Sequence, residues 1–241
     1  MKALVIVILT ALVAGNADWT RADEAQLSPF VAVYDVKYGS FSVGTSRTGL
    51  SRSALPGQWL IESRTTASGL AKLIAGGTIV QRSSFQLDAS GVQPLSYRFD
   101  DGTKRTARDV TLDFDWRAGR VKGIAEGAAV DIEVETGLQD AASMQAFVLQ
   151  RLSGGNEPGM IAMIEKDRVQ HYRHTLLRHE RLSTALGVFD TVVYRSARDG
   201  SKREVLLWYA PALGYVNVRA EQRRDGKLLF QTYIKTYQPG A

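Results

Sequence analysis

Apolar and polar residues alternate along almost the entire chain, and this period of two restricts the fold more than any other sequence feature. Such alternation is typical of β-strands that bury one face of a sheet. In the first alternating stretch Phe30, Ala32 and Tyr34 share one face, while Asp35 and Lys37 fall on the other. The pattern predicts strands at residues 30–38, 41–50, 59–67, 78–87, 94–100, 108–115, 120–124, 129–135, 159–165, 170–177, 188–196, 203–209, 215–223 and 228–237.

Tight-turn dipeptides separate several of these stretches. Asp101-Gly102, Asp199-Gly200 and Asp225-Gly226 each lie between two predicted strands, and Asp-Gly suits the positive φ angles of a two-residue hairpin. Hairpins join antiparallel neighbours, whereas parallel strands need long crossover connections. We therefore predict a mainly β fold, built as a large curved antiparallel sheet or a partly closed β-barrel.

One segment replaces the alternation with a helical period. Over residues 140–152, Met144, Val148 and Leu152 recur at intervals of four, and Asp140 is a suitable N-cap. A lone amphipathic helix must bury its apolar stripe. We expect this helix to pack on the sheet and to cover one of its openings.

The N-terminus has the layout of a secretory signal peptide. Lys2 supplies a positive charge, and residues 3–14 form an uncharged apolar run that precedes small-residue cleavage sites at Ala17 and Ala22. We favour cleavage after Ala22 and predict a signal peptide over residues 1–22. The run is shorter than the about 20 apolar residues of a membrane-spanning helix, and we expect no transmembrane segment in the mature chain. The expected location of the exported chain is the periplasm.

The mature chain, residues 23–241, is predicted to form a single β-rich domain, because no repeat, low-complexity tract or long linker divides it. The chain contains no cysteine, which excludes disulfides, thiolate chemistry and the cysteine-linked lipid of a lipoprotein. A short apolar segment at residues 69–75 separates two strands. It is either a packed connection or a short helix over the rim of the sheet.

The charge of the chain is basic. The formal net charge is +5, and it becomes +4 once residues 1–22 are removed with Lys2 and Arg21 against Asp18. A basic exported protein favours anionic partners, such as lipid headgroups or another anionic component of the cell envelope. We expect no nucleic-acid partner, because no basic helix or aromatic-basic motif is present. No feature identifies a protein partner.

The residues that usually carry catalysis do not form a recognisable site. His171 and His174 would face opposite sides of a strand, and arginines lie between them and His179. Asp131, Glu133 and Glu135 share a strand face whose opposite side is apolar, so we expect that face to be exposed to solvent. We expect Asp113 and Asp115, which also share a face, to pair with nearby arginines. The chain has no nucleophile elbow, phosphate-binding loop or dinucleotide fingerprint. We therefore predict no catalytic, cofactor-binding or metal-binding residues, and do not expect an enzyme.

Aromatic and basic residues are the candidates for ligand binding. Residues 205–209 are apolar on both strand faces, so this strand is either central or covered on two sides. In a curved sheet a second apolar face is able to line a cavity, although a core filled with side chains is the alternative. The proposed ligand-binding residues are Trp208, Phe147, Arg168, Arg173 and Arg178.

Several elements in a fixed order resemble a known family. They are Tyr34-x-Val36, Val43-Gly44, Gly91-x-x-Pro94-x-x-Tyr97, Phe114-Asp115-Trp116, Gly137-x-x-Asp140, Leu182-x-Thr184-x-x-Gly187-x-Phe189-x-Thr191 and Leu207-Trp208-Tyr209-Ala210-Pro211. Their succession, over about residues 30–235, resembles an exported Gram-negative family known only as domain of unknown function 3108. The resemblance implies an envelope β protein and no catalytic residues. More loosely, the architecture is similar to periplasmic lipoprotein carriers, whose incomplete barrels shelter acyl chains.

These observations favour a non-enzymatic periplasmic protein that binds or carries a lipid or another amphiphile. In that hypothesis acyl chains lie inside the sheet and headgroups lie near the arginines. The first alternative is an adaptor or assembly factor of the cell envelope. The second is an envelope hydrolase, which requires convergent carboxylates or a serine-histidine contact.

Overall fold

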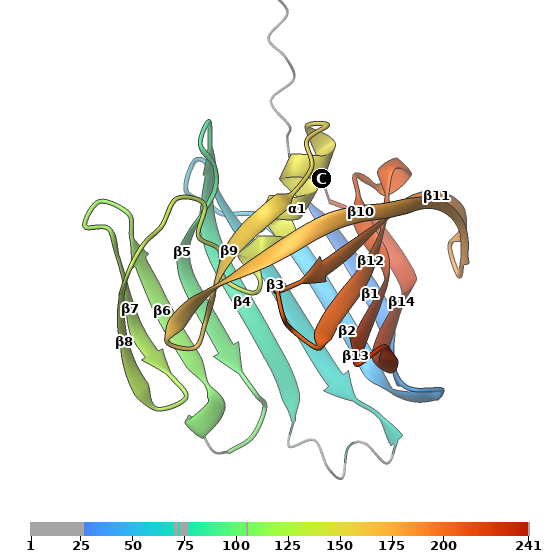
Figure 1. Cartoon of the computed structure of the whole chain (residues 1–241), viewed down its shortest axis with the longest axis horizontal. Coiled ribbons are helices and arrows are strands. Elements are labelled where there is room, and N and C mark those ends of the chain that lie inside the picture. The colour runs from blue at the N-terminus through green and yellow to red at the C-terminus, as the bar shows by residue number, and fades with distance from the viewer. Residues whose placement is uncertain (1–26, 70–71, 73–76, 105, 241) are drawn as a thin grey trace, which may run out of the picture.

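The computed structural model of the chain describes residues 27–69, 72, 77–104 and 106–240. Within these ranges the chain forms fourteen strands and one α-helix, joined mostly by short turns (Figure 1). The elements are β1 (Phe30–Tyr38), β2 (Phe41–Arg52), β3 (Gln58–Ala67), β4 (Thr78–Asp88), β5 (Gly91–Asp100), β6 (Val110–Asp115), β7 (Arg120–Ala125), β8 (Ala128–Glu133), α1 (Ser143–Ser153), β9 (Gly159–Glu165), β10 (Arg168–Thr184), β11 (Gly187–Ala197), β12 (Arg203–Ala210), β13 (Val216–Arg224) and β14 (Lys227–Pro239), with 3-10 turns at Thr106–Arg108 and Pro211–Leu213.

All fourteen strands belong to one antiparallel sheet, in the order β8-β7-β6-β5-β4-β3-β2-β1-β14-β13-β12-β11-β10-β9. Strands β1 to β8 form one meander and β9 to β14 a second. The two meanders join where β1 pairs with β14, from Phe30 opposite Pro239 to Tyr38 opposite Phe230. The sheet is strongly curved (Figure 1), and its edge strands β8 and β9 do not pair with each other. The predicted mainly β fold with a large curved antiparallel sheet is confirmed.

Side chains, not a strand ladder, link the two edges of the sheet. Lys166, in the turn after β9, forms an ion pair of 2.7 Å with Glu126 in the turn before β8. His171 of β10 lies 2.8 Å from a carboxylate oxygen of Glu135, just after β8. Both pairs are partly exposed, so each contributes little to stability. They mark where the curled sheet approaches closure without reaching it.

Glycine is required where neighbouring strands approach most closely. Gly123 of β7 has φ +155°, and a Cβ atom there would lie 1.9 Å from the carbonyl oxygen of Thr111 in β6. Any other residue would have to push β6 and β7 apart, because real Cβ atoms do not approach an oxygen so closely. This glycine permits the tight packing of the short strands β6, β7 and β8.

Helix α1 lies in the connection between β8 and β9, at one end of the curled sheet (Figure 1). It lies against β4 and β5, and its Ala146 and Leu149 join the main apolar core. On another side, Val148 and Leu152 pack in a cluster with Ile161, Tyr194 and Tyr209 of the second meander. The predicted packing of an amphipathic helix on the sheet is confirmed.

The helix begins at Ser143, three residues later than the predicted start. Gln139 forms an isolated bridge with β9. Its backbone N–H donates a hydrogen bond of 2.9 Å to the carbonyl oxygen of Ala162. This pairing holds the chain extended up to Asp140, whose carboxylate then accepts hydrogen bonds from the amides of Ala142 and Ser143 at 2.8 Å each. Asp140 thus bonds the first free amides of the helix, as an N-terminal acidic residue does.

The long hairpin of β10 and β11 differs most from the predicted boundaries. Strand β10 spans Arg168–Thr184, whereas the sequence pattern ended this strand at residue 177. A bulge between Leu176 and Arg178 shifts the alternation by one residue, and such a shift breaks the period of two. The predicted signal peptide and most of the apolar segment 69–75 lie outside the described residues. None of the helices in the described ranges is long and apolar enough to cross a lipid bilayer.

Candidate functional site

An interior cavity of about 300 Å³ lies between the concave face of the sheet and helix α1. Both meanders form its wall. Strands β1 to β4 of the first meander line one side, and β12 to β14 of the second meander line the other. The lining residues are Phe30, Tyr34, Ser46, Thr48, Ile61, Ser63, Thr65, Ile79, Gln81, Gln145, Leu149, Leu207, Tyr209, Val216, Asn217, Ala220 and Thr232. The concave face is therefore not completely filled by its own side chains.

Hydroxyl groups form a ladder along one wall of the cavity. Thr48 and Ser63 share a hydrogen bond of 2.8 Å between their hydroxyl oxygens. Thr65 donates a similar bond of 2.9 Å to Ser46. The ladder follows from the alternation of β2 and β3, because directly paired residues of adjacent strands place their side chains on the same face. Each hydroxyl retains capacity for a further hydrogen bond to a ligand.

Two tyrosines, Tyr34 of β1 and Tyr209 of β12, line the same cavity. Burial raises the pKa of both phenol groups above their ordinary value, so both stay neutral at physiological pH. Neither phenol oxygen hydrogen-bonds to the described part of the protein. Buried phenol groups usually find a partner, and here the cavity is the space in which a ligand would supply one.

Among the described residues that line this cavity there is no aspartate, glutamate, lysine, arginine or histidine. Aliphatic and aromatic carbons make up one part of its wall, and neutral hydroxyl and amide groups make up the rest. A buried ion needs a paired charge or several hydrogen bonds to offset its lost hydration. The wall therefore suits an uncharged ligand that is partly apolar and partly able to hydrogen-bond.

A buried carboxylate positions the helix that closes one end of the cavity. Besides its bonds to the helix amides, Asp140 accepts a hydrogen bond of 2.6 Å from the hydroxyl of Ser83 in β4. Burial raises the pKa of Asp140 to about 6, while the hydrogen bonds from Ser83 and the helix amides act in the opposite direction. The contact fixes α1, and with it the lining residues Gln145 and Leu149, against the first meander.

Of the five predicted ligand-binding residues, Trp208 and Arg178 lie together. Trp208 is buried between Leu207 and Tyr209, which both line the cavity, so alternation turns Trp208 to the opposite face of β12. There Arg219 and Arg178 lie 4.6 and 5.8 Å from its ring centre. The indole nitrogen of Trp208 is buried and has no hydrogen-bond partner in the part of the chain that the structure describes.

The other three predicted residues are dispersed. Arg168 lies 3.3 Å from Asp167 and Arg173 lies 3.5 Å from Asp199, both on the exposed surface of the first half of β10. Phe147, on α1, is half-buried and packs against both apolar clusters. None of the five lines the interior cavity. Sequence reasoning missed the cavity residues. The available signal was that Ser63 and Thr65 continue the face of β3 that begins with the apolar Trp59 and Ile61.

The histidines occupy separate environments. His174 is buried on β10, and neither ring nitrogen has a hydrogen-bond partner within the described ranges. Burial lowers the pKa of His174 to about 4, so the ring is neutral at physiological pH. His171 instead contacts Glu135 at the edge of the sheet. A serine-histidine contact of the kind that a hydrolase needs is not among the hydrogen bonds of the described residues.

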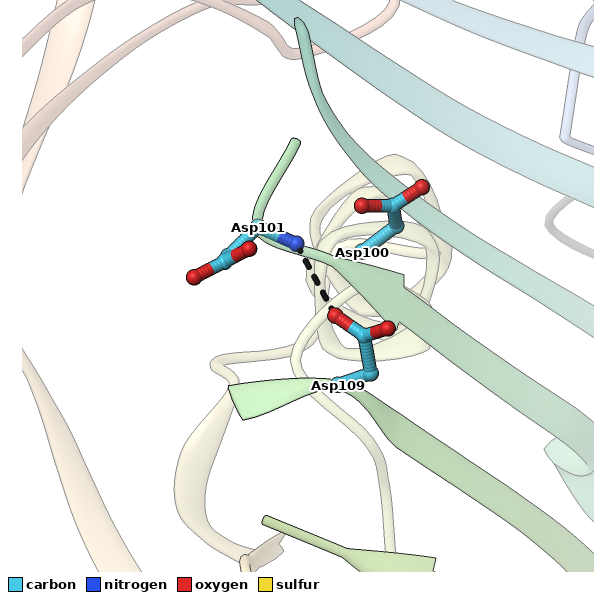
Figure 2. Close-up of side chains that lie close together, drawn as sticks. All are labelled: Asp100, Asp101 and Asp109. Carbon is cyan, nitrogen blue, oxygen red and sulfur yellow. Dashed lines mark hydrogen bonds between the residues drawn. The ribbon is translucent and has the colours of Figure 1, made fainter. Parts of the chain in front are cut away.

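Three carboxylates that the sequence patterns did not combine lie close together after β5. Figure 2 shows Asp100, Asp101 and Asp109, which bring one oxygen each within 4.8 Å of one another. Asp100 accepts a bond of 2.7 Å from the amide of Gly102, and Asp101 accepts bonds from Thr103. Asp109 accepts a longer bond of 3.4 Å from the amide of Asp101 (Figure 2). These bonds organise the β5–β6 loop.

Solved structures from several bacteria are similar to this chain to different degrees. The β-barrel-like protein of domain of unknown function DUF1849 from Brucella abortus has a TM-score of 0.57 at 12% identity, covering 89% of this chain and 99% of that one. A provisionally named lipoprotein from Parabacteroides distasonis has a TM-score of 0.38 at 12% identity, covering 88% and 96%. A provisionally named exported protein with YmcC-like fold from Bacteroides fragilis has a TM-score of 0.35 at 12% identity, covering 88% and 97%.

The first of these similarities supports the β-barrel-like fold alone, because the sequences are only distantly similar. None of the curated proteins matches the chain in sequence. The sequence profile of the family described as protein of unknown function (DUF3108) matches residues 33–227. The chain therefore belongs to the DUF3108 family.

Proposed function

We propose that the chain is a non-enzymatic binding protein whose interior cavity holds an uncharged amphiphile. The observation that supports the proposal is the composition of the cavity wall. Aliphatic side chains such as Ile61 and Leu149 face a ladder of hydroxyl groups and two phenol groups that have no hydrogen-bond partner among the described residues. The ligand class that fits is a short apolar chain or ring system with hydroxyl or amide groups.

The size of the cavity narrows the ligand further. A volume of about 300 Å³ lies at the lower end of the range for small-molecule pockets, about 300–1,000 Å³. A single short acyl chain or a small neutral amphiphile is therefore favoured over a complete phospholipid. A charged headgroup would have to remain outside the cavity, because the wall offers it no paired charge.

Export to the periplasm is part of the proposal, because a carrier of amphiphiles would act in the compartment between two membranes. The signal-peptide pattern of residues 1–22 supports it. The intact mass of the chain recovered from a periplasmic fraction tests it. A mature chain that starts at Asp18 or Asp23 is expected, and a full-length chain that stays with the cytoplasm would contradict export.

The main test is native mass spectrometry of the mature chain purified from the periplasm, followed by organic extraction of any bound molecule. A stoichiometric adduct of lipid-like mass is expected. Thr65→Arg, which places a bulky cation in the cavity, should abolish the adduct. Thr66→Arg is the matched control, because the neighbouring side chain is exposed on the other face of β3. Equal adducts in both variants would contradict binding in the cavity.

An envelope adaptor is the second candidate, and one observation favours it. The outer half of the β10–β11 hairpin leaves Leu177, Leu186 and Val188 exposed next to Arg178 and Arg181. Exposed apolar side chains with a basic border are typical of a protein interface. Leu186→Ser with Val188→Ser should then release a specific envelope partner identified by crosslinking, while Thr65→Arg should not. A partner retained equally by both variants would contradict an interface at this hairpin.

A further inference from the structure

Three aromatic side chains are exposed at the end of the sheet opposite α1. They are Tyr38 at the end of β1, Phe41 at the start of β2 and Phe230 near the start of β14, with exposed fractions of 53%, 74% and 41%. Tyr38 pairs directly with Phe41 and with Phe230. The rings of Tyr38 and Phe230 are in contact, with centres 5.1 Å apart. We name these three residues the aromatic rim.

The aromatic rim continues the wall of the interior cavity. Tyr34 lines the cavity, and Tyr38 follows it by four residues on β1 without a bulge in its pairing to β14 between them. Likewise Thr232 lines the cavity, and Phe230 precedes it by two residues. Even spacing along a strand keeps side chains on the same face. The rim therefore extends the concave face from the cavity to the open end of the sheet.

The turn that carries the rim is held in place by hydrogen bonds. Gly39 has φ +56°, a conformation suited to glycine in a tight hairpin turn. Its amide donates to the carbonyl of Leu229 at 3.1 Å, and its carbonyl accepts a bond of 2.7 Å from the side-chain amide of Gln231. These bonds tie the β1–β2 turn to β14. The aromatic rings are therefore presented on a fixed backbone, not on a free loop.

Cations border the rim at the same end of the sheet. The neighbouring β13–β14 and β11–β12 turns expose Lys202, Arg203, Arg224 and Lys227, against the acidic residues Asp199 and Asp225. Asp225 is shared between Lys202 and Arg224, at 3.7 and 3.9 Å, and Lys227 forms no ion pair within the described residues. The surface around the rim thus keeps a net positive charge.

Single exposed apolar residues are normal on a soluble protein, but three neighbouring aromatic side chains with a basic border, on the strand face that leads out of a cavity, are not. Tyrosine and other aromatic side chains favour the interface between lipid headgroups and acyl chains, and basic residues are attracted to anionic headgroups. We propose that the aromatic rim docks on the surface of an anionic phospholipid bilayer, so that the cavity opens towards the membrane. This inference rests on the proposed function, because it treats the mouth as the entrance for the ligand.

Flotation with lipid vesicles tests the docking surface directly. The mature chain is mixed with phosphatidylcholine vesicles that contain or lack phosphatidylglycerol. We expect binding to the anionic vesicles, and a loss of about tenfold or more in the partition coefficient of the triple variant Tyr38→Ser, Phe41→Ser, Phe230→Ser. A tenfold loss corresponds to about 1.4 kcal/mol. If the triple variant does not fold, the single variant Phe41→Ser replaces it in the assay, because it removes only the most exposed of the three rings. Phe41→Trp should retain full binding.

The hairpin variant Leu186→Ser with Val188→Ser is the matched control, because it removes exposed apolar side chains far from the rim in sequence. It should bind vesicles as the unmodified chain does. Equal partitioning of the rim variants and the unmodified chain would overturn the proposal, as would a loss confined to the hairpin variant. Light scattering tests whether a second copy of the chain binds at the rim instead of a bilayer. If the unmodified chain is a dimer and the rim variants are monomers, a second copy covers the rim and the proposal is overturned.

Ligand transfer separates this proposal from the function on which it rests. The folded rim variant should still take up ligand presented in detergent micelles, but acquire it from vesicles much more slowly. A rim variant that takes up ligand from vesicles at the unmodified rate would overturn docking at the rim and leave the binding function standing. An unmodified chain that binds no ligand from either source, yet floats with vesicles through the rim, would contradict the cavity function alone.

Discussion

The two ends of the concave face are built by the same strands but have different chemistry. At the helix end the inward positions of β3 and β4 are Trp59 and Phe85, both fully buried in the apolar core. Further along β3, the inward positions become Ser63 and Thr65, which line the cavity. The strands keep their alternation throughout. One end of each strand thus stabilises the fold, while the other is left free to bind.

The largest contrast between the two ends should appear in stability. Trp59→Ala removes a fully buried ring at the helix end and is expected to lower the free energy of unfolding by about 3–5 kcal/mol. Thr65→Val, at the cavity end of the same strand, should change it by less than about 1 kcal/mol. Urea denaturation of both variants measures the difference. Similar losses in the two variants would break the comparison.

The helix end should also dominate the pH dependence of stability, through Asp140. Its pKa is raised to about 6 in the folded protein from 3.8, so the folded state binds the proton more tightly. The contribution of Asp140 to stability is therefore fully present below pH 3.8 and is lost as the pH rises through about 6, by an amount on the order of 3 kcal/mol. Asp140→Asn should remove this dependence while keeping an acceptor for the helix amides.

The decisive measurement is the free energy of unfolding of Asp140→Asn relative to the unmodified chain from pH 4 to pH 8. The relative stability of the variant should increase towards pH 8. A difference that stays constant over this range would mean that the buried carboxylate is not strained by burial.

His174 should have the opposite dependence. Its pKa falls to about 4 in the folded protein from 6.5, so its contribution is present above pH 6.5 and is lost as the pH falls through about 4. The two groups oppose each other between pH 4 and pH 6, and the unmodified chain should have a flatter profile than either variant. Relative to the unmodified chain, His174→Gln should therefore gain stability as the pH is lowered from 6.5 to 4, measured as the difference in the free energy of unfolding. A difference that stays constant over this range would contradict a neutral buried histidine.

The smallest effect on stability is expected from the phenol groups of the cavity. Tyr209→Phe removes a hydroxyl that bonds to no described part of the protein, so the free energy of unfolding should change by no more than about 0.5 kcal/mol. Ligand affinity should nevertheless fall several-fold, because one hydrogen bond contributes about 0.5–1.5 kcal/mol. Calorimetric unfolding and titration with the extracted ligand measure the two effects. An unchanged affinity would remove Tyr209 from the site.

Much of this fold is readable from the sequence, because alternation and Asp-Gly turns are local signals. All the predicted strands are present, and the helix differs by three residues at its start. The cavity is harder to read. Ser63 and Thr65 look like solvent-facing positions, since the sequence does not reveal that the opposite wall stays distant. Residues 205–209 are apolar on both faces, so nothing local distinguishes Leu207, which lines the cavity, from Trp208, which does not.

The pairing of β1 with β14 also determines when, during synthesis of the chain, β1 is able to pair with this neighbour. The two strands that join the meanders are separated by about 200 residues, and a ribosome adds about 5–20 residues per second. For about 10–40 seconds after β1 emerges, its partner strand does not yet exist. During that interval β1 presents an unpaired edge, which is a template for association with other chains. We expect β1 of a nascent chain with this strand order to need protection from association until β14 has been synthesised.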